Sequence, residues 1–481
     1  MGGKMKKNER GLSAGHLTMM ALGSVIGGSF FLGSAVGVHA AGPAIIISYI
    51  LGGILIYFIL YALSEMTVAN PNSGSFYTFT AQIYGPGAGF VVGWVYWTGM
   101  ILAMSSEATA ISILVRQWFP NLSLSLLGSF IIIAVTLVNL LGASKLSKLE
   151  SSLAIIKITA IIAFIIISIL LVVGAIKGTA AIGAGELAKE PLMPGGIKSI
   201  AGSMLVVVFS YAGFEVIGLA ASEAREPHKT IPKAIRNTVI SLVSLYILSA
   251  IAILPLIPTA QVNEDTSPFV AALNRWGMDW VGTVINFVLV TAILSTMLAS
   301  MFGLGRMMRS LADEGHAPGF LKDHRDVPYR GILFSGAGML VGLGFGMMFP
   351  RAYLFLISSG GFATLYTYAA ILATHIRFRK CNGCPPEGKC QMPGYPYTTW
   401  IGLISMIVII LSMPFIPGQT SGLVAGIVMV VFFYAVYFIM KQYTARHSTK
   451  TERTLRTKFS EEFSGDLTKN KKGKQKNERC R

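Results

Sequence analysis

Twelve long apolar stretches follow one another along this chain of 481 residues, and they constrain its fold more than any other feature. A helix needs about 20 predominantly apolar residues to cross the hydrocarbon core of a bilayer. Only 13% of the residues are charged, whereas soluble proteins average about 25%. The sequence therefore predicts an all-α integral membrane protein with twelve transmembrane helices. They are expected near residues 15–40, 43–65, 87–114, 124–142, 152–175, 199–221, 235–257, 278–302, 331–349, 352–376, 398–417 and 420–440.

The basic residues indicate how the chain is oriented. The formal net charge is +17, and with twelve spans most of the 39 Lys and Arg residues fall on the side that holds both termini. Because short basic loops stay on the cytoplasmic side of membranes, we expect both termini in the cytoplasm and the protein in the cell membrane. A nucleic-acid partner is not expected, because the positive charge follows the membrane topology. The lipid bilayer is the expected surrounding partner.

Two terminal segments lie outside the expected helices. Residues 1–14 form a short cytoplasmic N-terminus, and residues 441–481 form a basic tail. The tail has few apolar residues and is expected to be disordered. It is either a solvated extension or a contact for anionic lipid headgroups.

A cytoplasmic loop at residues 377–397 carries three cysteines, Cys381, Cys384 and Cys390. Thiols stay reduced in the cytoplasm, so we expect free thiols here. A zinc site is the weaker alternative, because no second Cys or His pair follows at the usual spacing.

The first apolar stretch contains the segment GSVIGGSFF, which is unusual for a membrane helix. An unpaired backbone group is costly in hydrocarbon, so irregular backbone survives only where it is buried in protein or lines a polar cavity. Gly23, Gly27 and Gly28 lack a Cβ and permit both unwinding and close approach of a ligand. Ser24 and Ser29 offer hydroxyls to the freed groups. The segment predicts either a broken helix or a close helix contact, since small residues also serve packing.

A second interrupted stretch favours the broken helix. The sixth expected span reads VVVFSYAGFEVIGLAASEA and places polar and flexible residues at its centre, namely Phe209, Ser210, Tyr211, Gly213, Glu215 and Gly218. Two interrupted spans at matching positions of two five-helix groups indicate a binding site between inverted repeats. We therefore expect a five-plus-five inverted repeat with helices 1 and 6 broken, formed by residues 15–176 and 198–376. Two extra C-terminal helices at residues 398–440 lie outside this repeat.

The two breaks define the chemistry of the expected ligand. A half-helix exposes N–H groups at its N-terminus, which favour an anion, and carbonyl groups at its C-terminus, which favour a cation. The N–H groups of residues 27–29 therefore suit a carboxylate, and the carbonyl groups of Val25 and Phe209 suit an ammonium group. A zwitterionic amino acid satisfies both ends without any charged side chain of the protein.

Four blocks of the chain resemble the amino acid permeases of the amino acid-polyamine-organocation superfamily, and among them the bacterial amino acid transporter branch. The blocks are GSVIGGSFFLGSA, SEMTVANPNSGSFYTFTAQIYGPGAGFVVGWVYW, FSYAGFEVIGLAASEAREPHKTIPKAIRN and GLGRMMRSLADEGHAPGFL, in this order. The resemblance covers about residues 11–445. It implies twelve helices in a five-plus-five inverted repeat, alternating access, and secondary transport of amino acids.

The resemblance also implies which residues bind the substrate. The family reads Gly-Thr-Gly or Gly-Ser-Gly at the first break, whereas this chain has Gly27, Gly28 and Ser29, so side-chain specificity cannot be copied from relatives. Phe209 resembles the aromatic gate over the substrate, with ordinary packing as the alternative. The expected substrate-binding residues are Ser24, Val25, Ile26, Gly27, Gly28, Ser29, Glu107, Phe209, Ser210, Tyr211 and Gly213.

Lys157 lies inside the fifth expected span. It is about 9 Å deep at 1.5 Å per residue, so it either snorkels to the cytoplasmic edge or lies buried. In related permeases a lysine on this helix sits where sodium-coupled relatives bind a metal ion. The resemblance therefore implies that the Lys157 ammonium replaces the ion and couples transport to a proton gradient, with no metal and no cofactor.

Carboxylates within spans are costly in hydrocarbon and are expected to be functional. Glu107 is expected near the outer face, where it meets the substrate amine or a neighbouring helix, and a boundary glutamate facing water is the alternative. Glu215 follows the second break, where the next half-helix favours a negative charge, so we expect a structural cap in preference to substrate contact. Glu65, at the end of the second span, is a candidate partner for the basic residues of SEAREPHKTIPKAIRN, which suit an inner gate.

An enzyme is not expected, because the sequence has no phosphate-binding loop, no zinc-protease signature and no nucleophile motif in a fitting context. We expect a proton-coupled permease that imports a neutral amino acid, with pocket walls from spans 1, 3, 6, 8 and 10. The alternatives are an amino acid or polyamine antiporter or exchanger, and a transporter-like sensor that binds amino acids without accumulating them. The preferred amino acid does not follow from the sequence.

Overall fold

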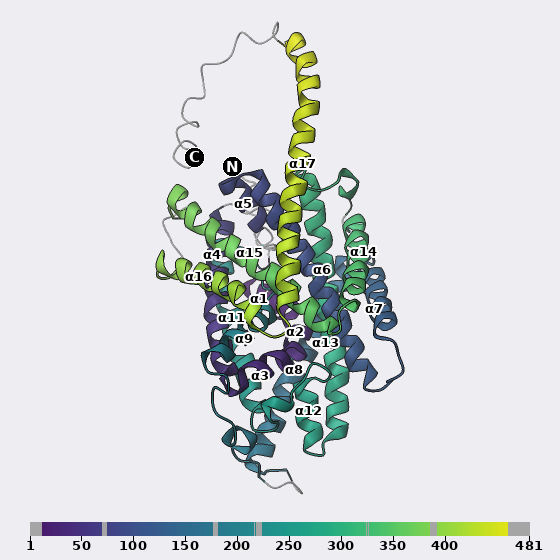
Figure 1. Cartoon of the computed structure of the whole chain (residues 1–481), viewed down its shortest axis with the longest axis vertical. Coiled ribbons are helices and arrows are strands. Elements are labelled where there is room, and N and C mark those ends of the chain that lie inside the picture. The colour runs from purple at the N-terminus through teal and green to yellow at the C-terminus, as the bar shows by residue number, and fades with distance from the viewer. Residues whose placement is uncertain are drawn as a thin grey trace, which may run out of the picture.

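The chain folds into an array of helices that run roughly along the long axis of the molecule (Figure 1). The computed structural model describes residues 12–69, 75–176, 181–215, 217, 224–323, 325, 327–384 and 392–459. Within these residues, nine helical segments are long and apolar enough to cross a membrane, and α7 (Leu124–Asn139) and α9 (Ile197–Ser210) are apolar but shorter. The prediction of an all-helical membrane protein is therefore confirmed, while the count of twelve spans stays a prediction.

The first expected span is divided, as predicted. α1 (Ala14–Val25) ends before Ile26 and Gly27, which are extended, and two helices follow, α2 (Gly28–Phe31) and α3 (Gly33–Ala41). Gly27 has φ −139° and ψ −158°, far from helical values, so the series of helical hydrogen bonds stops there. The prediction of a broken first helix is confirmed.

The remaining helices follow in the order of the apolar stretches. They are η1 (Gly42–Ala44), α4 (Ile45–Ala69), α5 (Ser75–Tyr84), α6 (Pro86–Arg116), α8 (Ala143–Val173), η2 (Gly185–Ala188), α11 (Pro227–Ile253), η4 (Thr259–Gln261), α12 (Pro268–Arg275), α13 (Asp279–Asp313), η5 (Gly319–Leu321), α14 (Tyr329–Met347), α15 (Ala352–Asn382), α16 (Tyr397–Ser412), η6 (Met413–Phe415) and α17 (Thr420–Phe459). α6 and α15 pack against each other and are largely covered, whereas α17 leaves most of its apolar surface exposed. An apolar exposed face is expected of a helix that borders lipid.

The C-terminal helix is longer than the sequence predicts. We expected the last span to end at residue 440 and a disordered tail to follow, but α17 continues to Phe459 and projects beyond the other helices (Figure 1). No Pro or Gly occurs between residues 441 and 459, so nothing in the sequence stops a helix already nucleated in the span.

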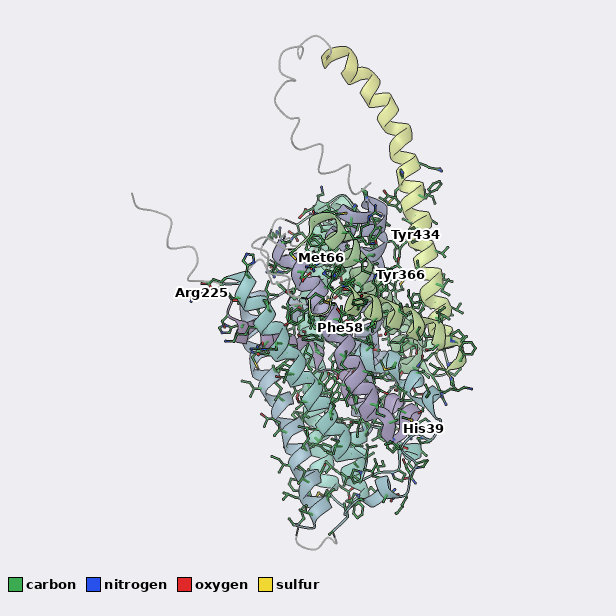
Figure 2. All side chains as sticks on the ribbon, turned by 90° about the vertical axis from the view of Figure 1, so that its left-hand side faces the viewer. His39, Phe58, Met66, Arg225, Tyr366 and Tyr434 are labelled. Carbon is green, nitrogen blue, oxygen red and sulfur yellow. The ribbon has the colours of Figure 1, made fainter. Side chains whose placement is uncertain are left out.

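Figure 2 shows Met66, near the end of α4, in the half from which α17 projects, and His39 of α3 in the opposite half.

The cysteine loop also differs from expectation. Cys381 and Cys384 are joined by a disulfide, whereas the sequence predicts reduced thiols. α15 ends at Asn382, and Gly383 has φ +70°, which turns the chain so that cysteines three residues apart can meet. Cys390 lies outside the described residues. Within the described part of the chain, no group of three His, Cys, Asp or Glu side chains could hold a metal ion.

Glu65 is fully buried near the end of α4 and lies against α15. Its carboxylate is 2.7 Å from Nε2 of His375 and 3.3 Å from the guanidinium of Arg379. It also accepts a hydrogen bond from the N–H of Met392 at 2.6 Å. The sequence pointed instead to the basic residues that follow the sixth span. The observed contacts tie α4 to α15 and to the chain that leads into α16.

Replacing Glu65 with alanine should lower the stability of the purified protein. Removing one member of a buried ion pair typically costs about 3–5 kcal/mol, because the partner charge stays buried without compensation. We expect a melting temperature several degrees lower in detergent. Glu226→Ala is the control, because Glu226 is 53% exposed in its pair with Lys229 and should contribute little. Equal melting temperatures for the two variants would contradict a structural role for Glu65.

Candidate functional site

The break between α1 and α2 frees two carbonyl groups, and a lysine binds both of them. Nζ of Lys157, on α8, donates to the carbonyls of Gly23 and Ile26 at 2.7 and 3.0 Å. The hydroxyl of Thr296, on α13, lies 3.1 Å from the same Nζ and donates to the carbonyl of Ile26 at 2.8 Å. Lys157 is fully buried, so the alternative that it snorkels to the membrane edge is wrong. The ammonium lies at a helix C-terminus, where a positive charge is favoured.

The N–H groups on the other side of the break bind a carboxylate of the protein itself. The N–H of Gly28 donates to Oε2 of Glu107 at 2.6 Å, and the N–H of Ser29 donates to Oε1 at 3.2 Å. Glu107 comes from α6 and is only 4% exposed, so the alternative of a boundary glutamate facing water is wrong. The N–H groups hold a carboxylate as their position suggests, but the carboxylate is that of Glu107.

Glycine is required where the carboxylate approaches the backbone. A Cβ on Gly28 would lie 2.7 Å from Oε2 of Glu107, and a Cβ on Gly27 would lie 3.1 Å from the same atom. Cβ atoms essentially never come within 3.0 Å of a heavy atom outside their own stretch of chain, so Glu107 would have to move if residue 28 had a side chain. Gly27 and Gly28 thus serve the close approach of an anion to the peptide groups.

The sixth expected span also stops being helical at its centre. α9 ends at Ser210, and residues 211–215 form turns in which Gly213 has φ +108°. Glu215 accepts a hydrogen bond from the N–H of Gly213 at 2.7 Å and another from the hydroxyl of Tyr368, on α15, at 2.8 Å. The carboxylate therefore holds the turn closed, as a structural cap would. Gly218 and most of the chain up to residue 223 lie outside the described residues.

The two interrupted segments touch each other. The hydroxyl of Ser24 donates to the carbonyl of Gly213 at 2.9 Å. A Cβ on Gly213 would lie 2.8 Å from the carbonyl oxygen of Ser24. Residues 189 positions apart in the sequence thus meet backbone to backbone, as expected of segments that form one site.

Three of the predicted site residues are engaged elsewhere. The carbonyl of Phe209, predicted to face an ammonium group, accepts a hydrogen bond from within its own turn, and the Phe209 ring is buried. The carbonyl of Ser210 accepts from the hydroxyl of Tyr246 at 2.9 Å, and the hydroxyl of Tyr211 donates to the carbonyl of Tyr49 at 3.1 Å. These groups hold α9 against α11 and α4.

Sequence reasoning missed two residues of the site. Thr296 binds the carbonyl of Ile26, and the hydroxyl of Tyr353 donates to the carbonyl of Gly28 at 3.2 Å. Thr296 lies in the eighth expected span and Tyr353 in the tenth, and both spans are expected to line the pocket. Neither residue carries a distinct signal, because a Thr hydroxyl in a membrane helix can also bind its own helix, and Tyr is common near the membrane interfaces.

Replacing Gly213 with alanine should disturb the contact between the two breaks. A side chain at φ +108° costs roughly 1–3 kcal/mol, and the new Cβ would press on the carbonyl of Ser24. We expect a lower melting temperature and weaker substrate binding. Gly303→Ala is the control, because a Cβ there meets nothing within 4 Å on α13 and should be tolerated. Normal binding by the Gly213 variant would show that the contact is dispensable.

The sequence also matches known proteins over most of its length. The sequence pattern that defines the amino acid permease family matches residues 16–453. This chain belongs to the amino acid permease family. The resemblance seen in the four sequence blocks is thereby confirmed, and the protein is a transporter, not an enzyme.

Several bacterial relatives align with this permease over most of their length. It is 32% identical over 430 residues to the gamma-aminobutyric acid permease of Bacillus subtilis (strain 168), covering 87% of this chain and 92% of that protein. It is 32% identical over 460 residues to the amino-acid permease RocC of the same organism, covering 92% and 97%. The aromatic amino acid transport protein AroP of Escherichia coli O157:H7 is 32% identical over 417 residues, covering 85% and 91%. Relatives with such different names share a similar identity, so the permease family alone does not fix the substrate.

Proposed function

We propose that this permease is a secondary active transporter that imports a neutral amino acid together with a proton by alternating access. It lies in the cell membrane with both termini in the cytoplasm. One observation supports the proposal above all others. At a single break in the first helix, two N–H groups hold a carboxylate and two carbonyl groups hold an ammonium.

In this proposal the substrate carboxylate takes the place of Glu107. Two carboxylates cannot share the N–H groups of Gly28 and Ser29, because like charges in a buried site repel each other strongly. Glu107 therefore binds these two N–H groups while the site is empty and moves away from them when an amino acid binds. The carboxylate of Glu107 keeps the N–H groups paired in the absence of substrate, as buried backbone groups require.

Lys157 is the proposed site of proton exchange. As an ammonium it donates hydrogen bonds to the carbonyls of Gly23 and Ile26 and balances the partial negative charge of the helix end. Without its proton, Lys157 would lose this charge, and the geometry of the break would relax. Coupling then arises because the break that Lys157 holds is the same break that presents the N–H groups to the substrate.

A neutral substrate side chain is favoured by the pairing of the charges near the site. Glu107 is bound by backbone N–H groups, Lys157 by carbonyl groups, and Glu215 by Gly213 and Tyr368. Buried charges that already have partners are poor ligands for a charged side chain. The proposal also includes an inverted five-plus-five repeat. The contact between the first break and the turn after α9 supports this repeat.

Uptake into proteoliposomes tests the proposed function. Purified permease is reconstituted, a pH gradient is imposed, and a panel of labelled amino acids and polyamines is offered. We expect accumulation of one or a few neutral amino acids above the outside concentration, driven by protons moving inward. Counterflow without any dependence on the gradient would indicate an exchanger. Binding without transport would indicate a sensor, and either result would contradict proton symport.

A further inference from the structure

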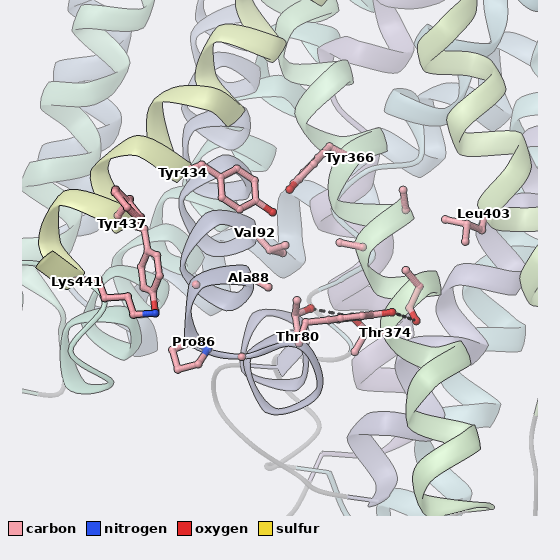
Figure 3. Close-up of a pocket in the computed structure, with 17 residues that line it drawn as sticks. Thr80, Pro86, Ala88, Val92, Tyr366, Thr374, Leu403, Tyr434, Tyr437 and Lys441 are labelled. Atoms are coloured by element: carbon pink, nitrogen blue, oxygen red, sulfur yellow. Dashed lines mark hydrogen bonds between the residues drawn. The ribbon is translucent and has the colours of Figure 1, made fainter. Parts of the chain in front are cut away.

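A groove on the outer surface of the helix array lies away from the broken helix. It has a volume of about 780 Å³ and runs between α5, the start of α6, α15, α16 and α17 (Figure 3). Tyr366 and Tyr434, which line it, lie in the half of the molecule from which α17 projects (Figure 2). No residue of the proposed substrate site lines this groove.

Small residues create the groove. α15 contributes Ala369, Ala370 and Ala373, and the start of α6 contributes Gly87 and Ala88. Because these residues have short side chains or none, the two helices cannot fill the space between them and α17. The floor that these residues form is apolar, which suits a hydrocarbon chain.

The wall on α17 combines aromatic rings with one charge. Tyr434, Tyr437, Phe438 and Lys441 lie at positions i, i+3, i+4 and i+7, so they share one face of the helix. Figure 3 shows Lys441 beside Tyr437 at one end of the groove, while the hydroxyls of Tyr434 and Tyr366 point toward each other farther along.

Lys441 stands at the boundary between the apolar span and its polar continuation. The apolar segment of α17 ends at Gln442, so Lys441 is at the depth of the lipid headgroups. It is exposed, and it makes no ion pair within the described part of the chain. A second cation is near, because the guanidinium of Arg377 lies over the ring of Tyr84, 5.2 Å from its centre. Tyr84 lines the same groove.

We propose that this groove is a binding site for one anionic phospholipid, with an acyl chain along the alanine floor and the phosphate at Lys441. The charge at the headgroup end distinguishes such a site from a general apolar surface. Basic pockets between transmembrane helices bind anionic headgroups, and tyrosines are favoured at the same depth. The lipid would link α17 to α5, α6 and α15, so it would stabilise the C-terminal helices without entering the substrate site.

Native mass spectrometry of the full-length permease in detergent tests this site. Phosphatidylglycerol and phosphatidylcholine with identical acyl chains are titrated separately. We expect one phosphatidylglycerol to bind more tightly than phosphatidylcholine, and Lys441→Gln to weaken phosphatidylglycerol binding about fivefold, the factor that corresponds to about 1 kcal/mol per basic residue. Equal binding of the two lipids, or an unchanged Lys441 variant, would overturn the proposal.

Two further variants make the result specific. Ala370→Phe fills the groove and should weaken binding of phosphatidylglycerol, with unchanged elution in size-exclusion chromatography as the folding check. Lys189→Gln removes a lysine that is 69% exposed beside η2 and should bind phosphatidylglycerol like the unmodified protein. An equal loss of binding in the Lys189 variant would show a nonspecific effect of charge and contradict the site. If Ala370→Phe fails to fold, the comparison of the two lysine variants still decides.

Discussion

Lys157→Met should abolish uphill accumulation of substrate by reconstituted permease. Methionine has a similar length but carries no charge and no donor, so the carbonyls of Gly23 and Ile26 would lose the ammonium that now binds them. In the proposed mechanism the variant has no group that exchanges the coupling proton. We expect labelled substrate to equilibrate across the liposome membrane at most, with no response when a pH gradient is imposed.

The matched control is Lys189→Met, which removes a lysine that is 69% exposed beside η2. It should accumulate substrate like the unmodified permease. A Lys157→Met variant that still accumulates substrate with an unchanged proton dependence would rule out Lys157 as the coupling residue. Size-exclusion chromatography before reconstitution separates a loss of coupling from a loss of folding.

Glu107→Gln should tighten substrate binding by about tenfold, or 1.4 kcal/mol. The glutamine amide has one acceptor oxygen, and its NH₂ group would face a second N–H donor, so it cannot bind Gly28 and Ser29 as the carboxylate does. The substrate carboxylate would then meet a weaker competitor for the same N–H groups. Direct binding of the preferred amino acid to purified protein measures the difference.

Glu226→Gln is the control for this experiment, because it neutralises an exposed carboxylate that pairs with Lys229 and should leave affinity unchanged. Binding that is weakened by Glu107→Gln would show that Glu107 contacts the substrate, for example its amine, and is not its competitor. This outcome would restore the role that the sequence alone suggests.

The fold could be predicted well from the sequence because the bilayer limits the choices. Apolar length predicts a span, and two spans interrupted by glycines and polar residues favour a break, since unpaired backbone groups are costly in lipid. The sequence did not predict that α17 extends to Phe459. The polar residues after the last span indicate that few side chains are buried there, but a helix that continues from a membrane-anchored span does not need burial in order to form.

The site could be predicted in part. Helix geometry alone predicts that the N–H groups near Gly28 bind a carboxylate. It does not predict that this carboxylate belongs to Glu107. Glu107 is 79 positions away, and only the packing of α6 against α2 brings it there. The same holds for Thr296 and Tyr353, whose contacts depend on how the helices are arranged in space. Local sequence identifies a polar break, and tertiary packing decides which side chains complete it.

An experimental structure of the permease in a lipid nanodisc with its preferred amino acid bound would test the central claim most directly. We predict that the substrate carboxylate lies about 3 Å from the backbone nitrogens of Gly28 and Ser29, with Glu107 moved out of that position. A continuous helix through residues 14–41 would contradict this account. So would a bound amino acid that leaves the carboxylate of Glu107 on both N–H groups.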